Sequence, residues 1–500
     1  MNLRRSRHRG TILLIAMWVM VILGVVVIIY AGQMRTELLA SSNRASANIA
    51  STVELGAEQY VLASVDNIDG EADYVLNLPG EALQIGNPQQ QQGGYFWLMR
   101  PAANEQTYEF GITDECSKLN LNYANATEII QLPGMANPVC DSIVDWVDTD
   151  SNSTNNDGAE TSYYQSLSEP YSAKNQPMET VEELRLVQGV DDSVLFGIDH
   201  NRNGVIESGE MAQGSMPQSS TGISANRGIY PFVTVFSTEP NTDMQGNPRI
   251  NVNALATGAG GRNTVAGGGR NGGGGRAAGG GGGGTTSAAG QQLLKVLTGA
   301  MSASKAQAAV TAAQNNGPFA NIFDFATKAN LTVQDLTPVS DKLSFLTGTA
   351  TTSPGMINVN TAPREVLMTL PGIQQNDVDA LISERQREDT SSTASIMWVA
   401  QALPMNRAAK IGKYLTNRSF IYSADIVAVS FDGRSFKRVR IIVDATASPA
   451  KIIYRKDLSS SGWPLSLETR QSLREGHGPG PSMQGSVAGS GNGIGSMGTK

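Results

Sequence analysis

The chain is poor in the residues that most often carry catalysis and metal binding. Its 500 residues include three histidines, at positions 8, 200 and 477, and two cysteines, Cys116 and Cys140. Histidine triads and histidine-rich metal centres are therefore excluded, and neither cysteine has a nearby histidine to activate a thiolate. If the bulk of the chain lies outside the cytoplasm, the cysteines could form one disulfide. It would close a loop of about 25 residues and stabilise the fold by roughly 3 kcal/mol; two unpaired buried thiols are the alternative.

An excess of positive charge is also lacking. The 37 Lys and Arg residues are outnumbered by 45 Asp and Glu residues, which gives a net charge of −8 and a pI near 5.1. Phosphate binding depends on clustered basic residues, so the composition predicts no nucleic-acid partner. The length suggests about three domains, and 40% hydrophobic residues are enough to bury cores.

Acidic residues are absent before Glu37, and no charged residue occurs from Thr11 to Gly32. A run of roughly 20 apolar residues is long enough to cross a bilayer as a helix. Four arginines precede the run, so the N-terminus is predicted to be cytoplasmic and the bulk of the chain to lie on the other side. A secretory signal peptide shares these features, but the run is long for one and no small-x-small cleavage site follows it.

The basic residues end in Gly10, directly before the apolar run. This arrangement resembles the leader of type IV prepilins, which a prepilin peptidase cleaves after such a glycine, here between Gly10 and Thr11. Most members carry Glu at the fifth mature position, where this chain has Ile15. That departure is characteristic of the minor pseudopilin K of type II secretion. A plain single-pass anchor is the alternative.

Strand-like segments occur in two groups about 300 residues apart. They are 95–99, 107–112, 419–431 and 435–443, with 451–455 as a further candidate. Asp432-Gly433 is a strong hairpin signal between the two longest segments. We expect one antiparallel sheet interrupted by a long insertion, as in a pilin head that carries an inserted domain.

Within the insertion, a phrase with two asparagines occurs three times, at 119–122, 250–253 and 357–360. The first and third copies continue into a helix, a Leu-Pro-Gly turn and a second helix, which is the pattern of a helix-hairpin-helix unit. The middle copy is interrupted by a glycine-rich tract, which reads as a flexible loop. We therefore expect three small helical modules.

The predicted fold class is α+β: a type IV pilin-like fold, with a long N-terminal helix and an antiparallel sheet, into which a large α-helical domain of helix-hairpin-helix or SAM-like modules is inserted. We expect a leader at 1–10, a membrane-spanning and amphipathic helix at 11–66 and the first part of the sheet at 67–113. The helical modules follow: the first, with acidic and EF-hand-like loops, at 114–227, the second at 228–340 with a glycine-rich insertion at 258–290, and the third at 341–416. The second part of the sheet is expected at 417–456 and a disordered Gly/Ser-rich tail at 457–500.

The segment from Asp199 to Glu210 matches the EF-hand loop pattern. Side-chain oxygens occupy positions 1, 3, 5, 9 and 12 through Asp199, Asn201, Asn203, Glu207 and Glu210. Gly204 at position 6 allows the sharp turn, and the carbonyl of Val205 completes the set, with Glu207 binding directly or through water. The two asparagines lower the ligand charge, which favours the weak Ca²⁺ affinity of extracellular sites. An acidic turn without metal is the alternative.

A second candidate site is an acidic stretch without Lys or Arg from 141 to 160. Its acids include Asp145, Asp148, Asp150, Asp157 and Glu160. Like charges at this density repel unless water or a cation neutralises them. A solvated loop and a Ca²⁺ site both account for the residues. Nothing separates an acid from a base, as glycoside hydrolysis requires.

The Leu-Pro-Gly turns also suggest DNA binding, because helix-hairpin-helix turns can offer backbone N–H groups to phosphate. However, the second glycine usual in such hairpins is replaced by Ala136 and Gln374, and the surrounding charge is acidic. A structural use of the motif is therefore favoured. A membrane-anchored pilus or DNA-uptake protein that binds DNA through these modules is the alternative function.

In order along the chain, several motifs look like those of the pseudopilin K family. They are Asp114-Glu115, 118–122, 143–148, 158–160 with Tyr163-Tyr164, 181–187, 231–235 and 250–253. The resemblance covers nearly the whole chain apart from the glycine tract, the tail and the third module, since the family typically has two modules.

The resemblance implies a non-enzymatic minor pseudopilin at the tip of the type II secretion pseudopilus, acting in protein export across the outer membrane. Its expected location is the inner membrane, single-pass, with a cytoplasmic N-terminus and a periplasmic bulk. The expected partners are the minor pseudopilins I and J, the inner-membrane assembly platform, the prepilin peptidase and the secretin or secreted proteins. Structural Ca²⁺ is implied, and by resemblance the acidic stretch, with Asp148, Asp150, Asp157 and Glu160, becomes one of its sites.

Overall fold

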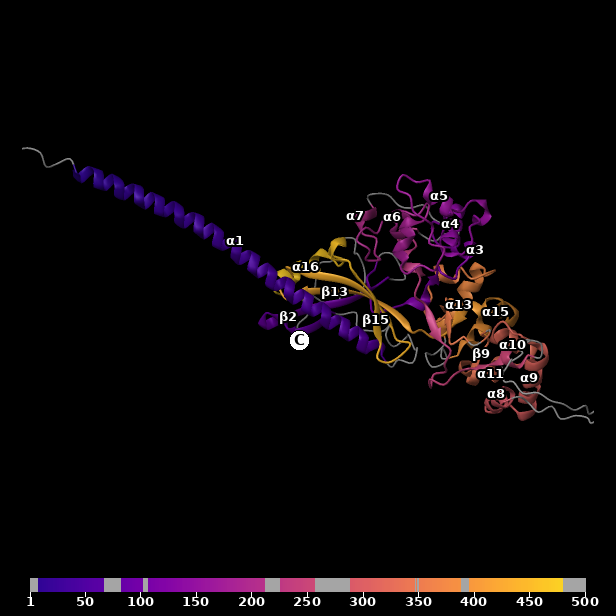
Figure 1. Ribbon diagram of the computed structural model, residues 1–500. Coiled ribbons are helices and arrows are strands. Elements are labelled where there is room, and N and C mark those ends of the chain that lie inside the picture. Colours follow the sequence, from indigo (N-terminus) through magenta and orange to yellow (C-terminus); the bar gives the residue numbers. More distant parts are fainter. Residues whose placement is uncertain are drawn as a thin grey trace, which may run out of the picture.

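The computed structural model describes residues 8–66, 82–101, 107–211, 225–256, 288–346, 348, 350–387 and 395–479. These residues form one long helix, one large antiparallel sheet and a helical region inserted between the two halves of the sheet (Figure 1). The predicted mixture of helix and antiparallel sheet is therefore confirmed. The first seven leader residues, most of the predicted glycine-rich insertion and the tail beyond 479 lie outside the described residues.

Helix α1 runs from His8 to Val65 and is about 87 Å long at 1.5 Å per residue. Its large apolar side chains from Ile12 to Tyr30 are all exposed. This part of α1 projects from the rest of the molecule (Figure 1) and is long and apolar enough to cross a membrane. Apolar surface exposed around a whole helix is stable in lipid rather than water, so α1 fits a single-pass anchor.

The second half of α1 packs on the sheet. Val53, Ala57, Val61 and Val65 follow at intervals of four residues and are fully buried. Residues at this spacing share one face of a helix, and here that face covers strands β2 (Gln92–Arg100), β13 (Ile421–Ser430) and β14 (Phe436–Asp444). The helix therefore changes from an apolar rod to an amphipathic cover for the sheet.

The sheet combines strands from both ends of the insertion. Its order is β1-β2-β13-β14-β15, all antiparallel, with β3 beside β2 and β4 beside β13. The bounds are β1 Leu83–Asn87, β2 Gln92–Arg100, β3 Glu109–Phe110, β4 Thr113–Asp114, β13 Ile421–Ser430, β14 Phe436–Asp444 and β15 Lys451–Asp457. Asp432 and Gly433 form the turn between β13 and β14, as predicted. Strand β1 was missed because its sequence, LQIGN, lacks an alternating apolar pattern.

The face of the sheet opposite α1 is covered by the C-terminal segment. Helix α16 (Leu467–Arg474) follows a short 3-10 turn at Ser459–Ser461. Leu465 and Leu473 are buried against Trp97 and Val427 of the sheet. The prediction of a disordered tail from residue 457 is therefore wrong up to residue 479. The apolar residues that hold this segment are few and far apart, and they gain a partner only when the sheet has formed.

The three asparagine phrases each open a helical module, and each module lies between two short strands. Each module begins with a two-residue strand and ends with a second one that pairs with it in parallel. In the first module the elements are β5 (Leu119–Asn120), α3 (Ala126–Ile129), α4 (Asn137–Val147), α5 (Thr161–Gln165), η4 (Val181–Leu186), α6 (Asp192–Phe196), α7 (Ser208–Met211) and β6 (Val233–Thr234).

The second module contains β8 (Ile250–Asn251), α8 (Ala288–Thr298), α9 (Ala303–Asn316), α10 (Ile322–Lys328), α11 (Val333–Leu336) and β9 (Leu343–Ser344). The third contains β11 (Ile357–Asn358), α12 (Arg364–Leu367), α13 (Gln375–Arg387), η8 (Ile396–Trp398), α14 (Val399–Ala402), α15 (Met405–Ile411) and β12 (Leu415–Thr416). The closing strands extend the first two modules past their predicted ends at 227 and 340, because pairs of two residues leave no periodic pattern.

The second asparagine of each phrase holds its module together. Asn122 donates to the carbonyl of Met178 and accepts from its amide at 3.0 and 2.7 Å. Asn253 makes the same pair of bonds to Phe319 at 2.9 and 2.7 Å. In the third module Asn360 accepts from the Trp398 indole at 3.0 Å. An amide can donate and accept at once, which explains why asparagine recurs here.

The second module is inserted between the two strands of a short antiparallel ribbon. Strand β7 (Thr238–Pro240) leads into it and β10 (Thr352–Pro354) leads out, and the two pair antiparallel with Pro240 opposite Thr352. The module also contacts the third one, where α10 packs on α15 and Asn321 donates to the Ala409 carbonyl at 2.8 Å. It lies at the end of the molecule away from the projecting part of α1 (Figure 1).

Candidate cation sites in the first helical module

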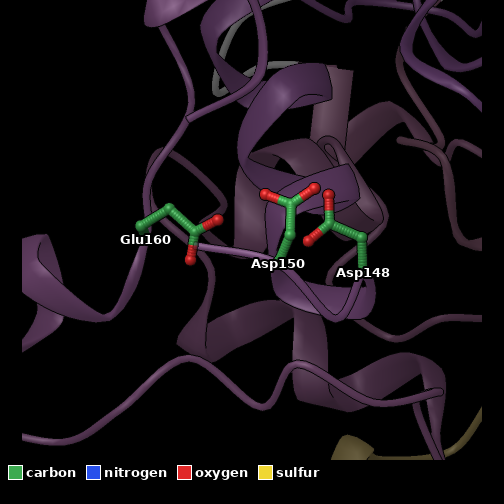
Figure 2. A group of neighbouring side chains, drawn as sticks. All are labelled: Asp148, Asp150 and Glu160. Atoms are coloured by element: carbon green, nitrogen blue, oxygen red, sulfur yellow. The ribbon is translucent and has the colours of Figure 1, made fainter. Parts of the chain in front are cut away.

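Three of the predicted acidic ligands meet where two helices of the first module end and begin. Asp148 is the C-cap of α4, Asp150 follows in the bend, and Glu160 is the N-cap of α5. Oxygen atoms of the three carboxylates all lie within 4.8 Å of one another. Asp148 and Asp150 lie side by side and Glu160 lies across from them (Figure 2).

Several oxygens of this cluster are buried without a hydrogen-bond partner. They are Asp148 Oδ1, both carboxylate oxygens of Glu160, and Oδ2 of the neighbouring Asp145. Glu160 is only 6% exposed and Asp145 is fully buried. Unpaired buried carboxylate oxygens are costly, so the cluster has the character of an incomplete coordination shell.

The electrostatics of the cluster also favour a cation. Burial, and then the charges of neighbouring acids, raise the pKa values of Asp148 and Glu160. Asp148 also stands at the C-terminal end of α4, where the helix dipole disfavours a negative charge and attracts a positive one. Among the described residues, no lysine or arginine forms an ion pair with Asp148, Asp150 or Glu160. A hard divalent cation that takes oxygen ligands, such as Ca²⁺, fits this donor set.

The structure changes the membership of this predicted site. Asp157 is exposed and does not join the cluster. Asp145 points an unpaired oxygen toward the backbone of Gly158, where a Cβ atom would come within 2.1 Å of Asp145 Oδ2. The i, i+3 spacing of Asp145 and Asp148 on one helix was the signal that could have identified Asp145.

The loop from Asp199 to Glu210 brings most of its predicted ligands together. Asp199 and Asn201 both accept from the Asn203 amide, at 3.1 and 3.0 Å, and Asp199 also accepts from the Gly204 amide at 2.8 Å. Glu210 reaches back to the His200 amide at 2.9 Å. The side-chain oxygens of positions 1, 3 and 12 therefore gather around the same turn.

Asp199 and Glu210 are 5% and 7% exposed. Burial raises the pKa of Asp199 to about 6, and the Glu210 charge adds to the shift. Gly204 has a φ of +80°, as the sixth position of such a loop requires. Two buried carboxylates in an all-oxygen loop fit a hard cation, although Glu207 is held by the Tyr108 hydroxyl at 3.0 Å. Asn203 Oδ1 accepts from the Val205 amide at 2.7 Å.

The predicted disulfide is not formed. Cys116 and Cys140 are both free and buried. Cys116 lies beside the Asp114 and Ser419 side chains next to the sheet, whereas Cys140 is part of α4 and packs in the core of the first module. Their burial explains why each thiol is stable without a partner, and burial raises the pKa of Cys140 to about 12. The predicted leader site, Gly10 and Thr11, lies in the first turn of α1.

These observations define an α+β protein with an apolar N-terminal helix and a sheet split by an acidic helical insertion. Residues 118–197 match the family model described as Type II secretion system (T2SS), protein K. A type II secretion system protein K of Pectobacterium carotovorum subsp. carotovorum is 24% identical over 200 residues, which are 38% of this chain and 61% of that protein. Over the first helical module and the segments around it, the chain is therefore similar to type II secretion system protein K.

Among solved structures, the chain also matches one from the GspK-GspI-GspJ complex of the type 2 secretion system of enterotoxigenic Escherichia coli. The match covers 85% of this chain and 99% of the other, at 13% sequence identity and a TM-score of 0.32. A likeness of this size does not define the fold, which rests on the chain's own helices and strands.

Proposed function

We propose that the chain is a non-enzymatic minor pseudopilin that caps the tip of the type II secretion pseudopilus and takes part in protein export across the outer membrane. The observation that carries this proposal is α1, with an exposed apolar half that projects from the molecule and an amphipathic half packed on an antiparallel sheet. This is the arrangement of a type IV pilin-like subunit. The apolar half serves first as a membrane anchor and, after cleavage between Gly10 and Thr11, as the shaft element of a filament.

The position at the tip is supported by the size and place of the insertion. The helical modules lie between β4 and β13 and extend from the sheet away from the projecting part of α1 (Figure 1). In a filament of parallel subunits, a further subunit stacked on that side would meet this bulk. Ile15 also supports a position at the tip. The acid usual at this position is thought to pair with the N-terminus of the preceding subunit, and a subunit at the tip has no preceding subunit.

The proposed partners follow from the same arrangement. Minor pseudopilins of the I and J types would pack beside α1 at the tip. The inner-membrane assembly platform and the prepilin peptidase would act on the membrane-anchored form, and the secretin or secreted proteins would meet the modules. We propose an inner-membrane location with a cytoplasmic N-terminus and a periplasmic head.

Calcium is proposed as a structural ion at two places, the acidic cluster and the loop from Asp199 to Glu210. The residues that would hold it are Asp145, Asp148, Asp150 and Glu160 in the cluster, and Asp199, Asn201, Asn203, Val205, Glu207 and Glu210 in the loop. In the cluster the ion would neutralise carboxylates that form no ion pair with a described lysine or arginine, and in the loop it would neutralise the buried Asp199 and Glu210.

The proposal is tested by deleting the gene in its own organism and measuring export. We expect secreted enzymes to accumulate in the periplasm, DNA uptake to continue, and export to return when the wild-type gene is supplied. A copy with Gly10 replaced by Val should fail to restore export and should keep its ten leader residues in a mass measurement. Normal export in the deletion strain would contradict the proposed function.

A further inference from the structure

The side chain of Arg438, the third residue of β14, connects the sheet to the loop from Asp199 to Glu210. Its guanidinium binds Asp425 of β13 through Nε and Nη2, at 2.9 and 2.6 Å. Nη1 donates to the carbonyl of Asn201 at 2.5 Å, and Nη2 donates to the carbonyl of Arg202 at 2.6 Å. One side chain of the sheet therefore holds two consecutive carbonyls of a loop more than 230 residues away in sequence.

The burial of Arg438 makes these bonds obligatory. The side chain is 0% exposed, and a buried guanidinium is stable only when its N–H groups are satisfied. Asp425 supplies the counter-charge but faces only one edge of the group, and it also binds Arg440 at 3.1 Å. The two loop carbonyls bring the number of bonded N–H groups to four of the five that a guanidinium carries, so the loop supplies half of the hydrogen bonds that stabilise this buried charge.

Other contacts hold the same loop against the rest of the head. Asn203 donates to the carbonyl of Pro464 in the C-terminal segment at 2.9 Å. Tyr108, just before β3, donates to Glu207 at 3.0 Å. The loop thus contacts three parts of the head, while its own helices belong to the first module. It is a joint between the helical insertion and the sheet.

Building on the cation site proposed above for this loop, we propose that Arg438 is a positioning residue that couples that site to the docking of the helical insertion on the sheet. The two carbonyls it holds belong to positions 3 and 4 of the loop, next to the ligands Asn201 and Asn203. Arg438 therefore keeps the turn in the shape in which the side-chain oxygens gather. Coupling between two sites is reciprocal, so a bound cation stabilises the contact between loop and sheet by the same free energy that Arg438 adds to cation binding.

The test uses the full chain in detergent, with Tb³⁺ as the probe. Asp148 and Asp150 are first replaced by Asn so that the acidic cluster does not compete for Tb³⁺. This double variant is the parent of all the variants that follow. We expect Tb³⁺ to bind with luminescence sensitised by Tyr108, and Glu210→Gln to abolish this signal. Arg438→Met should weaken binding at least tenfold. Arg438→Lys should weaken it similarly, because lysine keeps the charge but cannot span Asp425 and two carbonyls.

Arg455→Met is the matched control. Arg455 belongs to the neighbouring strand β15 and binds Glu54 and Glu58 of α1, so its loss disturbs the sheet without touching the loop. We expect its Tb³⁺ affinity to stay within about twofold of the parent. If Arg455→Met weakens binding as much as Arg438→Met does, general destabilisation is responsible and the proposed role of Arg438 is overturned.

Hydrogen exchange gives a second readout. Tb³⁺ should slow hydrogen exchange in β13 and β14 of the parent, and this long-range protection should be lost in Arg438→Lys. If Arg438→Met does not fold, Arg438→Lys alone decides the outcome. Wild-type affinity in both Arg438 variants, or protection confined to the loop in the parent, would refute the coupling while leaving the cation site intact. A parent that does not bind Tb³⁺ at all would refute the loop site itself, and the coupling with it.

Discussion

At the residue scale, the acidic stretch shows how much a local pattern can say about a site. The density of acids left both a solvated loop and a Ca²⁺ site open, and only the family resemblance favoured a site. The structure brings Asp148, Asp150 and Glu160 of that predicted site together. The predicted ligand set also included Asp157, which is exposed, but not Asp145, an acid of the same stretch that is buried beside the cluster. Density along the chain does not say which carboxylates share a side of the turn, because that depends on how α4 ends.

Replacing Glu160 by Gln should have opposite effects with and without calcium. With a chelator present, the variant should melt higher by about 2–4 °C, corresponding to about 1 kcal/mol, because one of several mutually repelling buried carboxylates is neutralised. When excess Ca²⁺ is added, the melting midpoint of the variant should rise less than that of the wild type, because a ligand is lost. Both midpoints can be read from thermal unfolding followed by circular dichroism.

Asp157→Asn is the control for this experiment, since Asp157 carries the same charge in the same stretch but is exposed and outside the cluster. Its midpoints should match those of the wild type in both conditions. If Glu160→Gln keeps the full calcium-dependent gain, the cluster is not a calcium site.

At the element scale, α1 meets the sheet through a charged contact as well as an apolar one. Glu54 and Glu58, one turn apart, are buried and share Arg455 of β15, at 2.8 and 2.7 Å. Two carboxylates facing one guanidinium leave one negative charge in excess at a buried surface. Burial, followed by the hydrogen bond with Glu58, raises the pKa of Glu54 to about 7, while Arg455 opposes the shift.

This pair predicts a pH dependence for the head-bound half of α1, well beyond its apolar membrane segment. Because the folded-state pKa of Glu54 is raised, the folded state binds the extra proton. Its contribution to stability is present below about pH 4.5 and declines as the pH rises to about 7. Unfolding by denaturant at several pH values should show this slope in the wild type, and Glu54→Gln should reduce it.

Glu37→Gln serves as the control on the same helix, because Glu37 is exposed and remote from the sheet. It should leave the slope unchanged. An unchanged slope in Glu54→Gln would show that another group is responsible.

At the scale of the whole molecule, the repeat explains how an additional module can be accommodated. The antiparallel ribbon of β7 and β10 places Pro240 opposite Thr352, so the chain leaves for the second module and returns at almost the same place. The first and third modules are tied to the sheet more directly. Buried Asp114 of β4 accepts from Asn358, Thr361 and Ser419.

Deleting residues 241–351 and joining the ribbon with an Asn-Gly turn should therefore leave a folded protein. Such a turn suits two antiparallel strands, and we expect cooperative unfolding with a midpoint lowered by a few degrees through the loss of the α10 and α15 contact. The matched control deletes 357–416, which removes Asn358 and Thr361, two of the three side chains that donate to Asp114, and should not fold. If the 241–351 deletion variant fails to fold, the second module is required for the stability of the head.

Several features of this protein were determined by the sequence alone. The apolar segment of α1, the hairpin at Asp432-Gly433 and the three asparagine phrases are local patterns, because spacing along one helix, one turn or one repeat is enough to define them. The sequence also predicted that the two distant groups of strands share one sheet, but the tertiary structure decided the other contacts between distant segments. The parallel strand pairs that close the modules, the C-terminal helix on the sheet, the exclusion of Asp157 from the acidic cluster, the unpaired cysteines and the contacts of Arg438 all depend on residues that meet only after folding. Burial, which sets the cost of an unpaired charge or the benefit of an apolar contact, is a property of that three-dimensional arrangement and has no signature in a short stretch of chain.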